Sequence, residues 1–131
     1  MKTIAIRTSG RTDFVDITAQ VAAAARELDV TGGIVTVFVP HTTAGVTINE
    51  NADPDATADM ELVLDRVVPW TGGYAHCEGN TAAHAKASMM GSSCQVIVED
   101  GRLALGTWQA IYFCEFDGPR SRKVWVSGVS G

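Results

Sequence analysis

The sequence has little of several residue types that define particular classes of protein. It has three cysteines, Cys77, Cys94 and Cys114, an odd number at spacings that match no common metal motif. A disulfide framework is therefore not expected, and a reducing compartment is indicated. No uninterrupted apolar stretch approaches the ~20 residues that span a bilayer, and no apolar leader stands at the beginning. These absences predict a cytoplasmic protein with no membrane partner.

Positive charge is also scarce. Ten Lys and Arg residues against fifteen Asp and Glu residues give a formal net charge of −5. This balance argues against nucleic acid as a partner. A small anionic ligand is still compatible with it, because one local group of cations or backbone N–H groups can bind such a ligand. With 46% hydrophobic residues, a chain of this length predicts one globular domain, residues 1–131.

Hydrophobic periodicity predicts strands at both ends of the chain and helices between them. The predicted strands cover residues 3–8, 14–17, 34–40, 44–49, 94–99, 103–116 and 123–129. The predicted helices cover residues 19–30, 54–68 and 81–90. Because strands outnumber helices and gather at the two ends, the class is α+β with antiparallel pairing.

Local signals sharpen four of these elements. Thr18 is expected to cap the first helix, and Asp53 followed by proline is a strong start signal for the second. Continuous β-branched residues predict that strand 34–40 is buried on both faces. Strand 103–116 is too long to stay straight, so a bend is expected at Gly106. The second helix is expected to bury a stripe made of Met60, Val63, Leu64 and Val67.

The three histidines are the first candidates for chemistry. His41 follows the strand expected to be most buried, His76 lies in a Gly-rich loop, and His84 lies on the third helix. Histidine is a common general base and metal ligand, because its neutral form exists near pH 7. No HExxH motif is present, and the alternative is that each ring is an ordinary polar group bonded to a carbonyl.

One face of the third helix is polar but carries short side chains. Asn80, His84 and Ser88 are spaced four apart and share this face. Their neighbours are Ala83, Ala87 and Gly91. A ligand or another subunit could approach closely there. The alternative is a solvated face, although such faces usually carry more charge than the one residue found here, Lys86.

Two further segments could contribute polar groups to a site. Glu50 ends a strand and has no role in a helix cap, so it is a candidate for acid–base catalysis or for binding a metal. Residues 106–109, Gly-Thr-Trp-Gln, are either a bulge with a core tryptophan or a bend that presents backbone N–H and side-chain groups to a pocket. Lys86 or Arg102 could add positive charge there. The basic residues at 120, 122 and 123 are expected to be a solvated turn.

Three segments resemble one known family. They are PHTTAGVTINENADPD, HCEGNTAAHAKASMMG and GRLALGTWQAIYFCEFDGPRSRK. Together they resemble the YjbQ-like family, also called the secondary thiamine-phosphate synthase family, along nearly the whole chain. The resemblance implies a β-sandwich of about seven mostly antiparallel strands in two sheets with two to three helices. It also implies a homotrimer with sheets packed around a threefold axis.

The resemblance also implies an activity and a site. The activity is a weak joining of hydroxymethylpyrimidine diphosphate and thiazole phosphate to thiamine phosphate, in a histidine-lined pocket near a subunit boundary. The expected metal ligands, for zinc or magnesium, are His41, His76 and His84. The expected acid–base residues are His41, His84 and Glu50. The expected ligand-binding residues are Thr43, Asn80, Lys86, Ser88, Thr107, Trp108 and Gln109.

Two other functions are compatible with the same residues. One is a trimeric protein that binds a metal or a phosphorylated ligand without chemistry, since the sequence has no nucleophile motif or phosphate loop. The other is a metal-assisted hydrolase, since three histidines leave an open coordination position on zinc. Many family members carry a carboxylate directly after the histidine of the middle segment, where this chain has Cys77.

Overall fold

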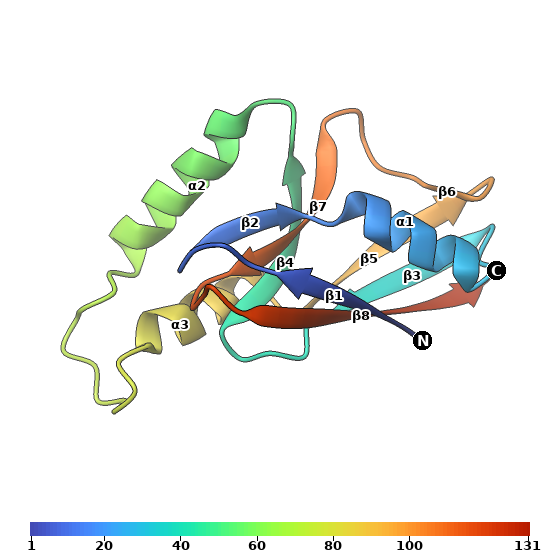
Figure 1. Ribbon diagram of the computed structural model, residues 1–131. Helices are drawn as coiled ribbons and strands as arrows, with labels where there is room; N and C mark the ends of the chain where they lie inside the picture. Colours follow the sequence, from blue (N-terminus) through green and yellow to red (C-terminus); the bar gives the residue numbers. More distant parts are fainter.

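Eight strands in two sheets form the body of the protein, and three helices lie around them (Figure 1). The computed structural model describes residues 1–131. The larger sheet has the order β1 (Lys2–Arg7), β8 (Ser121–Ser130), β3 (Gly33–Phe38), β5 (Ser93–Glu99), β6 (Arg102–Leu103). The smaller sheet has the order β2 (Asp13–Asp16), β7 (Gln109–Glu115), β4 (Ala44–Glu50). All pairings are antiparallel, which confirms the α+β sandwich.

The helices are α1 (Thr18–Glu27), α2 (Pro54–Val67) and α3 (Thr81–Met90). Asp53 caps α2 as predicted, since its Oδ1 accepts the Asp55 N–H at 2.9 Å. The predicted cap at Thr18 is wrong, because Thr18 is already the first helical residue. Its hydroxyl instead accepts the Ile111 N–H at 2.9 Å and so ties α1 to β7. None of the three helices is long and apolar enough to cross a membrane.

The main core lies between the sheets and under α1. It consists of 17 buried residues, among them Val21, Val35, Val37, Val46, Ile111, Phe113, Val124 and Val126. The prediction that strand 34–40 is buried on both faces is wrong. Ile34 is 43% exposed and Phe38 is 39% exposed, because nothing in the chain covers the outer face of the larger sheet. This outer face carries the exposed or half-buried apolar side chains Ile34, Phe38, Ile97, Trp125 and Val129.

The predicted single strand over 103–116 is also wrong. Leu103 pairs with Val98 in the larger sheet, whereas Gln109 pairs with Glu50 in the smaller one. Residues 104–108 carry the chain from one sheet to the other. The turn closes at Gly106, whose N–H donates to the Gln109 side-chain oxygen at 2.8 Å. The bend expected at this glycine is therefore a sheet crossing.

Helix α3 lies closely on the smaller sheet, and α2 flanks it (Figure 1). A Cβ added at Gly45 of β4 would lie 2.8 Å from the Gly91 carbonyl oxygen, so glycine is what lets α3 approach. Small side chains on α3 thus serve the packing of this helix against β4. Of the stripe predicted on α2, Leu64 is buried and Met60 is half-buried, but the prediction is wrong for Val63 and Val67, which are 54% and 62% exposed. Few elements of this chain reach that side of α2.

Candidate functional site

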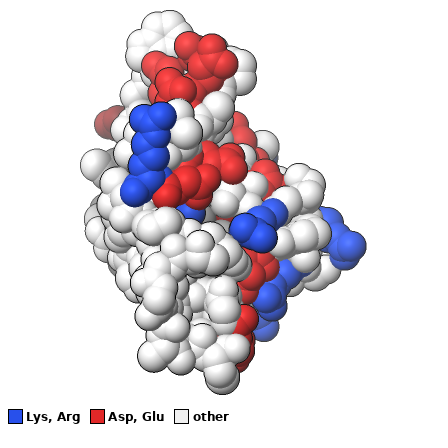
Figure 2. All heavy atoms as spheres, turned by 90° about the vertical axis from the view of Figure 1, so that its left-hand side faces the viewer, with Lys and Arg blue, Asp and Glu red and all other residues white.

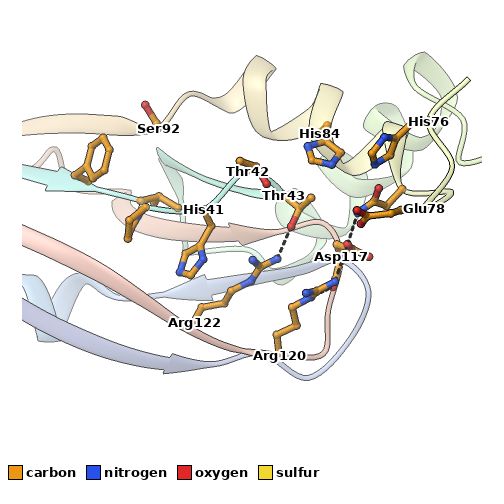
Figure 3. Close-up of a pocket in the computed structure, with 14 residues that line it drawn as sticks. His41, Thr42, Thr43, His76, Glu78, His84, Ser92, Asp117, Arg120 and Arg122 are labelled. Atoms are coloured by element: carbon orange, nitrogen blue, oxygen red, sulfur yellow. Dashed lines mark hydrogen bonds and ion pairs between the residues drawn. The ribbon is translucent and has the colours of Figure 1, made fainter. Parts of the chain in front are cut away.

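A cavity of about 590 Å³ opens where β3 ends and β8 begins, beside the start of α3 (Figure 3). The segment after β3, the loop before α3, α3 itself and the turn before β8 all contribute to it. Its polar lining includes His41, Thr43, His76, Asn80, His84, Arg120 and Arg122. The cavity therefore contains all three histidines and two arginines.

Arg122 is held by a buried carboxylate. Its Nε donates to Glu115 Oε1 at 2.8 Å, and its Nη2 donates to Glu115 Oε2 and to the Thr43 hydroxyl. The carboxylate also accepts the Thr8 hydroxyl at 2.8 Å and the Asp117 N–H at 3.0 Å. Nη1 has no hydrogen bond within the chain, and Arg122 lines the cavity. Nη1 is thus the nitrogen that can donate to a ligand.

Glu115 has no exposed surface. Burial raises the pKa of its carboxyl, but the Arg122 hydrogen bonds, the Asp117 N–H and the Thr8 hydroxyl outweigh burial and lower the pKa overall. The carboxylate is therefore ionised at neutral pH. It fixes the guanidinium geometrically and balances its charge.

Arg120 is fixed in a similar way by Asp117. Its Nε donates to the Asp117 carbonyl oxygen at 2.7 Å, and its Nη2 donates to Oδ2 at 2.9 Å. Asn80 Nδ2 donates to the same Oδ2 at 2.9 Å, which joins the start of α3 to the turn before β8. Asn80 Oδ1 is buried without a partner. Arg120 also keeps Nη1 free, so two guanidinium groups reach the cavity already oriented.

His41 takes the place of a missing strand partner. The β3–β8 pairing ends at Phe38 and Trp125, so Lys123 has no partner strand on that side. The His41 Nε2 atom accepts the Lys123 N–H at 3.0 Å and lies 3.2 Å from the Lys123 carbonyl oxygen. Burial and the nearby Arg122 charge lower the pKa of His41. The ring is therefore neutral at pH 7, and because Nε2 accepts, its proton is on Nδ1.

His76 and His84 lie together on the other side of the cavity (Figure 3). Their ring centroids are 5.3 Å apart, and the planes meet at 87°. Neither ring donates to or accepts from another group of the chain within hydrogen-bond distance, so their nitrogens are free for a ligand or a proton. The pair and His41 stand at different walls of one cavity.

The three histidines do not fit the expected metal centre. No three side chains among the His, Cys, Asp and Glu residues of the chain are grouped so that they could hold a metal ion. The Nε2 lone pair of His41 already accepts the Lys123 N–H, and its Nδ1 carries the proton. Within one protomer, the cavity thus combines the two anchored arginines and two free imidazoles with two carboxylates, Asp117, which binds Arg120, and Glu78.

Other predicted site residues lie apart from this cavity. Lys86 is buried on a different side of α3, where its Nζ binds Asp65 beside Arg11 and Trp70. The remaining four lie at the far end of β4 and are Glu50, Thr107, Trp108 and Gln109. Trp108 is 62% exposed there and is not a core residue.

The sequence interpretation missed Arg120, Arg122 and Glu115, because residues 120–123 were expected to be solvated. A signal for two of them was present. Arg122 has the same parity as the buried Val124 and Val126, so alternation points its side chain inward. Glu115 stands between the apolar residues 110–114 and Phe116, where an unpaired charge would be costly. A buried arginine and a buried glutamate in the same protein are expected to form an ion pair, so the contact between Arg122 and Glu115 could have been predicted.

The face shown in Figure 2 carries no broad basic surface. Acidic side chains gather in the upper part of that face, and the Lys and Arg side chains are separated from one another. Helix α2 contributes four carboxylates, Asp55, Asp59, Glu61 and Asp65. Attraction of an anion thus depends on local, oriented donors.

One family of known proteins matches this chain over nearly its whole length. The profile described as UPF0047 protein YjbQ-like matches residues 2–131. The chain is 54% identical to UPF0047 protein YugU of Bacillus subtilis over 127 residues, 96% of each protein. It is 48% identical to UPF0047 protein MJ1081 of Methanocaldococcus jannaschii, with 92% of this chain and 88% of that one covered.

Solved structures show the same fold. An uncharacterised YjbQ/UPF0047 family protein from Clostridium acetobutylicum has a TM-score of 0.96 and 56% identity, covering 98% of this chain and 100% of that one. Conserved hypothetical protein TT1486 from Thermus thermophilus has a TM-score of 0.92 and 40% identity, with coverages of 98% and 100%.

Proposed function

This chain belongs to the YjbQ-like UPF0047 family, and on that premise we propose that the cavity binds a small phosphorylated molecule. The observation that supports this most strongly is the pair of anchored arginines. Arg120 donates two hydrogen bonds to Asp117, and Arg122 donates two to Glu115. Both arginines line the cavity and have no hydrogen bond within the chain at Nη1. Oriented guanidinium groups suit phosphate oxygens, because little side-chain freedom remains to be lost on binding.

Within that site we propose a transferase activity of the thiamine-phosphate synthase type. In that reaction the bond between the pyrimidine-bearing carbon and the diphosphate oxygen breaks, and the electron pair leaves with the diphosphate. The thiazole nitrogen then supplies the electron pair of the new C–N bond. The free Nη1 atoms of Arg120 and Arg122 and the Nδ1–H of His41 would stabilise the charge that develops on the leaving group. His76 and His84 are free to accept or donate a proton.

A binding assay tests the first part of the proposal. Inorganic diphosphate is titrated into the protein by calorimetry, and Arg120→Ala is expected to weaken binding about tenfold or more, as for loss of a charge-assisted hydrogen bond. Arg66→Ala is the matched control, because it removes the same charge from exposed α2. Equal affinities for wild type and Arg120→Ala would reject the site.

An activity assay tests the second part. Thiamine phosphate is quantified after incubation with hydroxymethylpyrimidine diphosphate and thiazole phosphate, with and without added zinc or magnesium. His84→Ala and His41→Gln are expected to lower turnover by a factor of about 10² or more if these rings act in proton transfer or charge stabilisation. Unchanged turnover in both variants would overturn the assignment of these residues.

The second candidate is a protein that binds the phosphorylated ligand without chemistry. The favouring observation is that no hydroxyl or thiol in the cavity is bonded to a histidine, so no activated nucleophile is formed. Tight diphosphate binding without formation of thiamine phosphate would support this candidate. The metal-assisted hydrolase has no comparable support, since the histidines are not grouped around one point.

Self-association into a homotrimer is part of the same proposal. The outer face of the larger sheet is apolar, and Val129, Ile34 and Ile97 are cross-strand neighbours that are 73%, 43% and 62% exposed. Exposed apolar rows of this kind are typical of protein interfaces. Phe38 belongs to this face and also lines the cavity, so assembly would bring a partner close to the site. Sedimentation equilibrium that gives a stable monomer would refute it.

A further inference from the structure

A second cavity, of about 470 Å³, adjoins the first. The two cavities share His41, Thr42, His84 and Ser92. The rest of the second cavity is lined by Ala44, Ala87 and Ser88, so no Lys, Arg, Asp or Glu faces it. We call it the neutral chamber. The first cavity, which we call the charged chamber, holds Arg120 and Arg122 together with the carboxylates of Asp117, paired with Arg120, and Glu78.

The space in the neutral chamber depends on short side chains. Ala44 and Ala87 are 2% and 7% exposed and cannot move away, because the β4–α3 contact at Gly45 is already close. The Ser88 hydroxyl donates to the His84 carbonyl oxygen at 3.0 Å, so this side chain folds back along its own helix. A larger residue at position 88 would take up volume that is now open.

We infer that the two chambers divide one ligand between them. The phosphate or diphosphate group lies in the charged chamber, and an uncharged organic ring lies in the neutral chamber, with Ser88 limiting the size of that ring. This inference rests on the proposed function, because it needs phosphate in the charged chamber. It goes further by placing the two parts of the ligand in different chambers and by assigning Ser88 a role in specificity.

The opposite orientation is disfavoured by charge. A phosphate in the neutral chamber would lose water and would meet no arginine, only the His41 and His84 rings that both chambers share, which is costly. An uncharged ring in the charged chamber would cover the free Nη1 atoms without bonding them, which is also unfavourable. Because His41 and His84 line both chambers, the bond between ring and phosphate would lie between these two imidazoles.

The test compares two ligands that differ only by the ring. Calorimetry measures the affinities of inorganic diphosphate and hydroxymethylpyrimidine diphosphate for wild type, Ser88→Val, Ser88→Leu and Ala58→Leu. Ala58 is exposed on α2 and lines neither chamber, so Ala58→Leu adds the same bulk to a helix surface as a control. Far-UV circular dichroism establishes folding, and Ser88→Val carries the test if Ser88→Leu does not fold.

For wild type and the control, the ester is expected to bind about tenfold or more tightly than diphosphate, from burial of the ring. This affinity ratio is expected to fall in Ser88→Val and to approach one in Ser88→Leu. Diphosphate binding with an equal ratio in all variants would overturn the two-chamber inference and leave the proposed function standing. No diphosphate binding by wild type would overturn both.

Discussion

Arg122 and Lys86 are both buried cations, but the chain holds them in different ways. Arg122 is bound through two nitrogens to Glu115, which has no exposed surface, and also to Thr43. Lys86 has one partner, Asp65, whose side chain is 55% exposed. Arg122 thus belongs to a network of four polar side chains, which also includes Glu115, Thr43 and Thr8. Lys86 bridges two helices at the edge of solvent.

The difference follows from the two side chains. The guanidinium group is planar and presents several N–H donors in fixed directions, so a buried carboxylate can fix it while one nitrogen still faces the cavity. The ammonium group is a point charge on a flexible stem, so the stem can be buried while the charge reaches a partly hydrated carboxylate. The first arrangement holds an oriented donor at the cavity, as the proposed ligand site requires, and the second one links α2 to α3. Four predictions test this comparison.

The largest effect is expected for Glu115→Gln. It leaves the Arg122 charge buried without its partner, so the free energy of unfolding should fall by about 3–5 kcal/mol. Urea denaturation at pH 7 measures the change. Asp65→Asn is the counterpart on the other pair and should cost about 1 kcal/mol or less, because water can reach this site. A larger loss for Asp65→Asn than for Glu115→Gln would contradict the comparison.

The same pair should make stability depend on acid pH. The pKa of Glu115 in the folded protein lies below its ordinary value of 4.5, so the unfolded chain binds the proton more readily. The stabilisation is fully present above about pH 4.5 and is lost as the pH falls through the lower folded pKa. Urea midpoints between pH 7 and pH 3 should show the gap between wild type and Glu115→Gln closing as the pH falls. A constant gap would refute this.

A smaller effect is expected for His41→Ala, which leaves the Lys123 N–H without a partner and should cost about 1–3 kcal/mol. His41→Gln should recover part of the loss, since its amide oxygen can accept the same N–H. Nitrogen-15 NMR of the wild type at pH 7 should show a neutral ring with the proton on Nδ1. A proton on Nε2 would show that the ring donates to the Lys123 carbonyl oxygen instead.

The smallest effect is expected for Lys86→Met. Replacing the lysine stem by an apolar side chain of similar length keeps the packing, so the free energy of unfolding should change by less than about 1 kcal/mol. Diphosphate affinity should fall less than in Arg120→Ala, because Lys86 lines a separate pocket beside Trp70 and Arg11 and does not reach the cavity that holds Arg120. A loss of affinity equal to that of Arg120→Ala would show that Lys86 contacts the diphosphate, as the sequence predicted.

Elements with strong local signals were predictable from the sequence. The strand at the N-terminus alternates, Asp53 precedes a proline at the start of α2, and Asp100–Gly101 turns with both residues at positive φ. The path of residues 103–116 was not predictable. A glycine inside an apolar segment is typical both of a bent strand and of a crossing between two sheets, so Gly106 does not distinguish them. The exposure of Val63 and Val67 also escaped prediction, since periodicity gives the apolar face of a helix and does not say what covers it.

The site was predictable only in part. His41, Thr43, His76, Asn80 and His84 meet in one cavity, and Ser88 lies in the adjoining one. Lys86 was assigned to the wrong side of α3, because sequence spacing alone does not show which side a neighbouring helix covers. Glu50 and residues 107–109 lie at the other end of β4, since that strand runs from the cavity toward the sheet crossing.

The sequence by itself determined the class of fold, the helix and turn signals, and the residue types available for anion binding, because these depend on neighbours within a few positions. Only the tertiary structure decided which cations line the cavity. The contacts that do so join distant residues, with 82 positions between His41 and Lys123 and 107 between Thr8 and Glu115. Strand register brings these residues together, and the low polarity of the core then fixes how they pair.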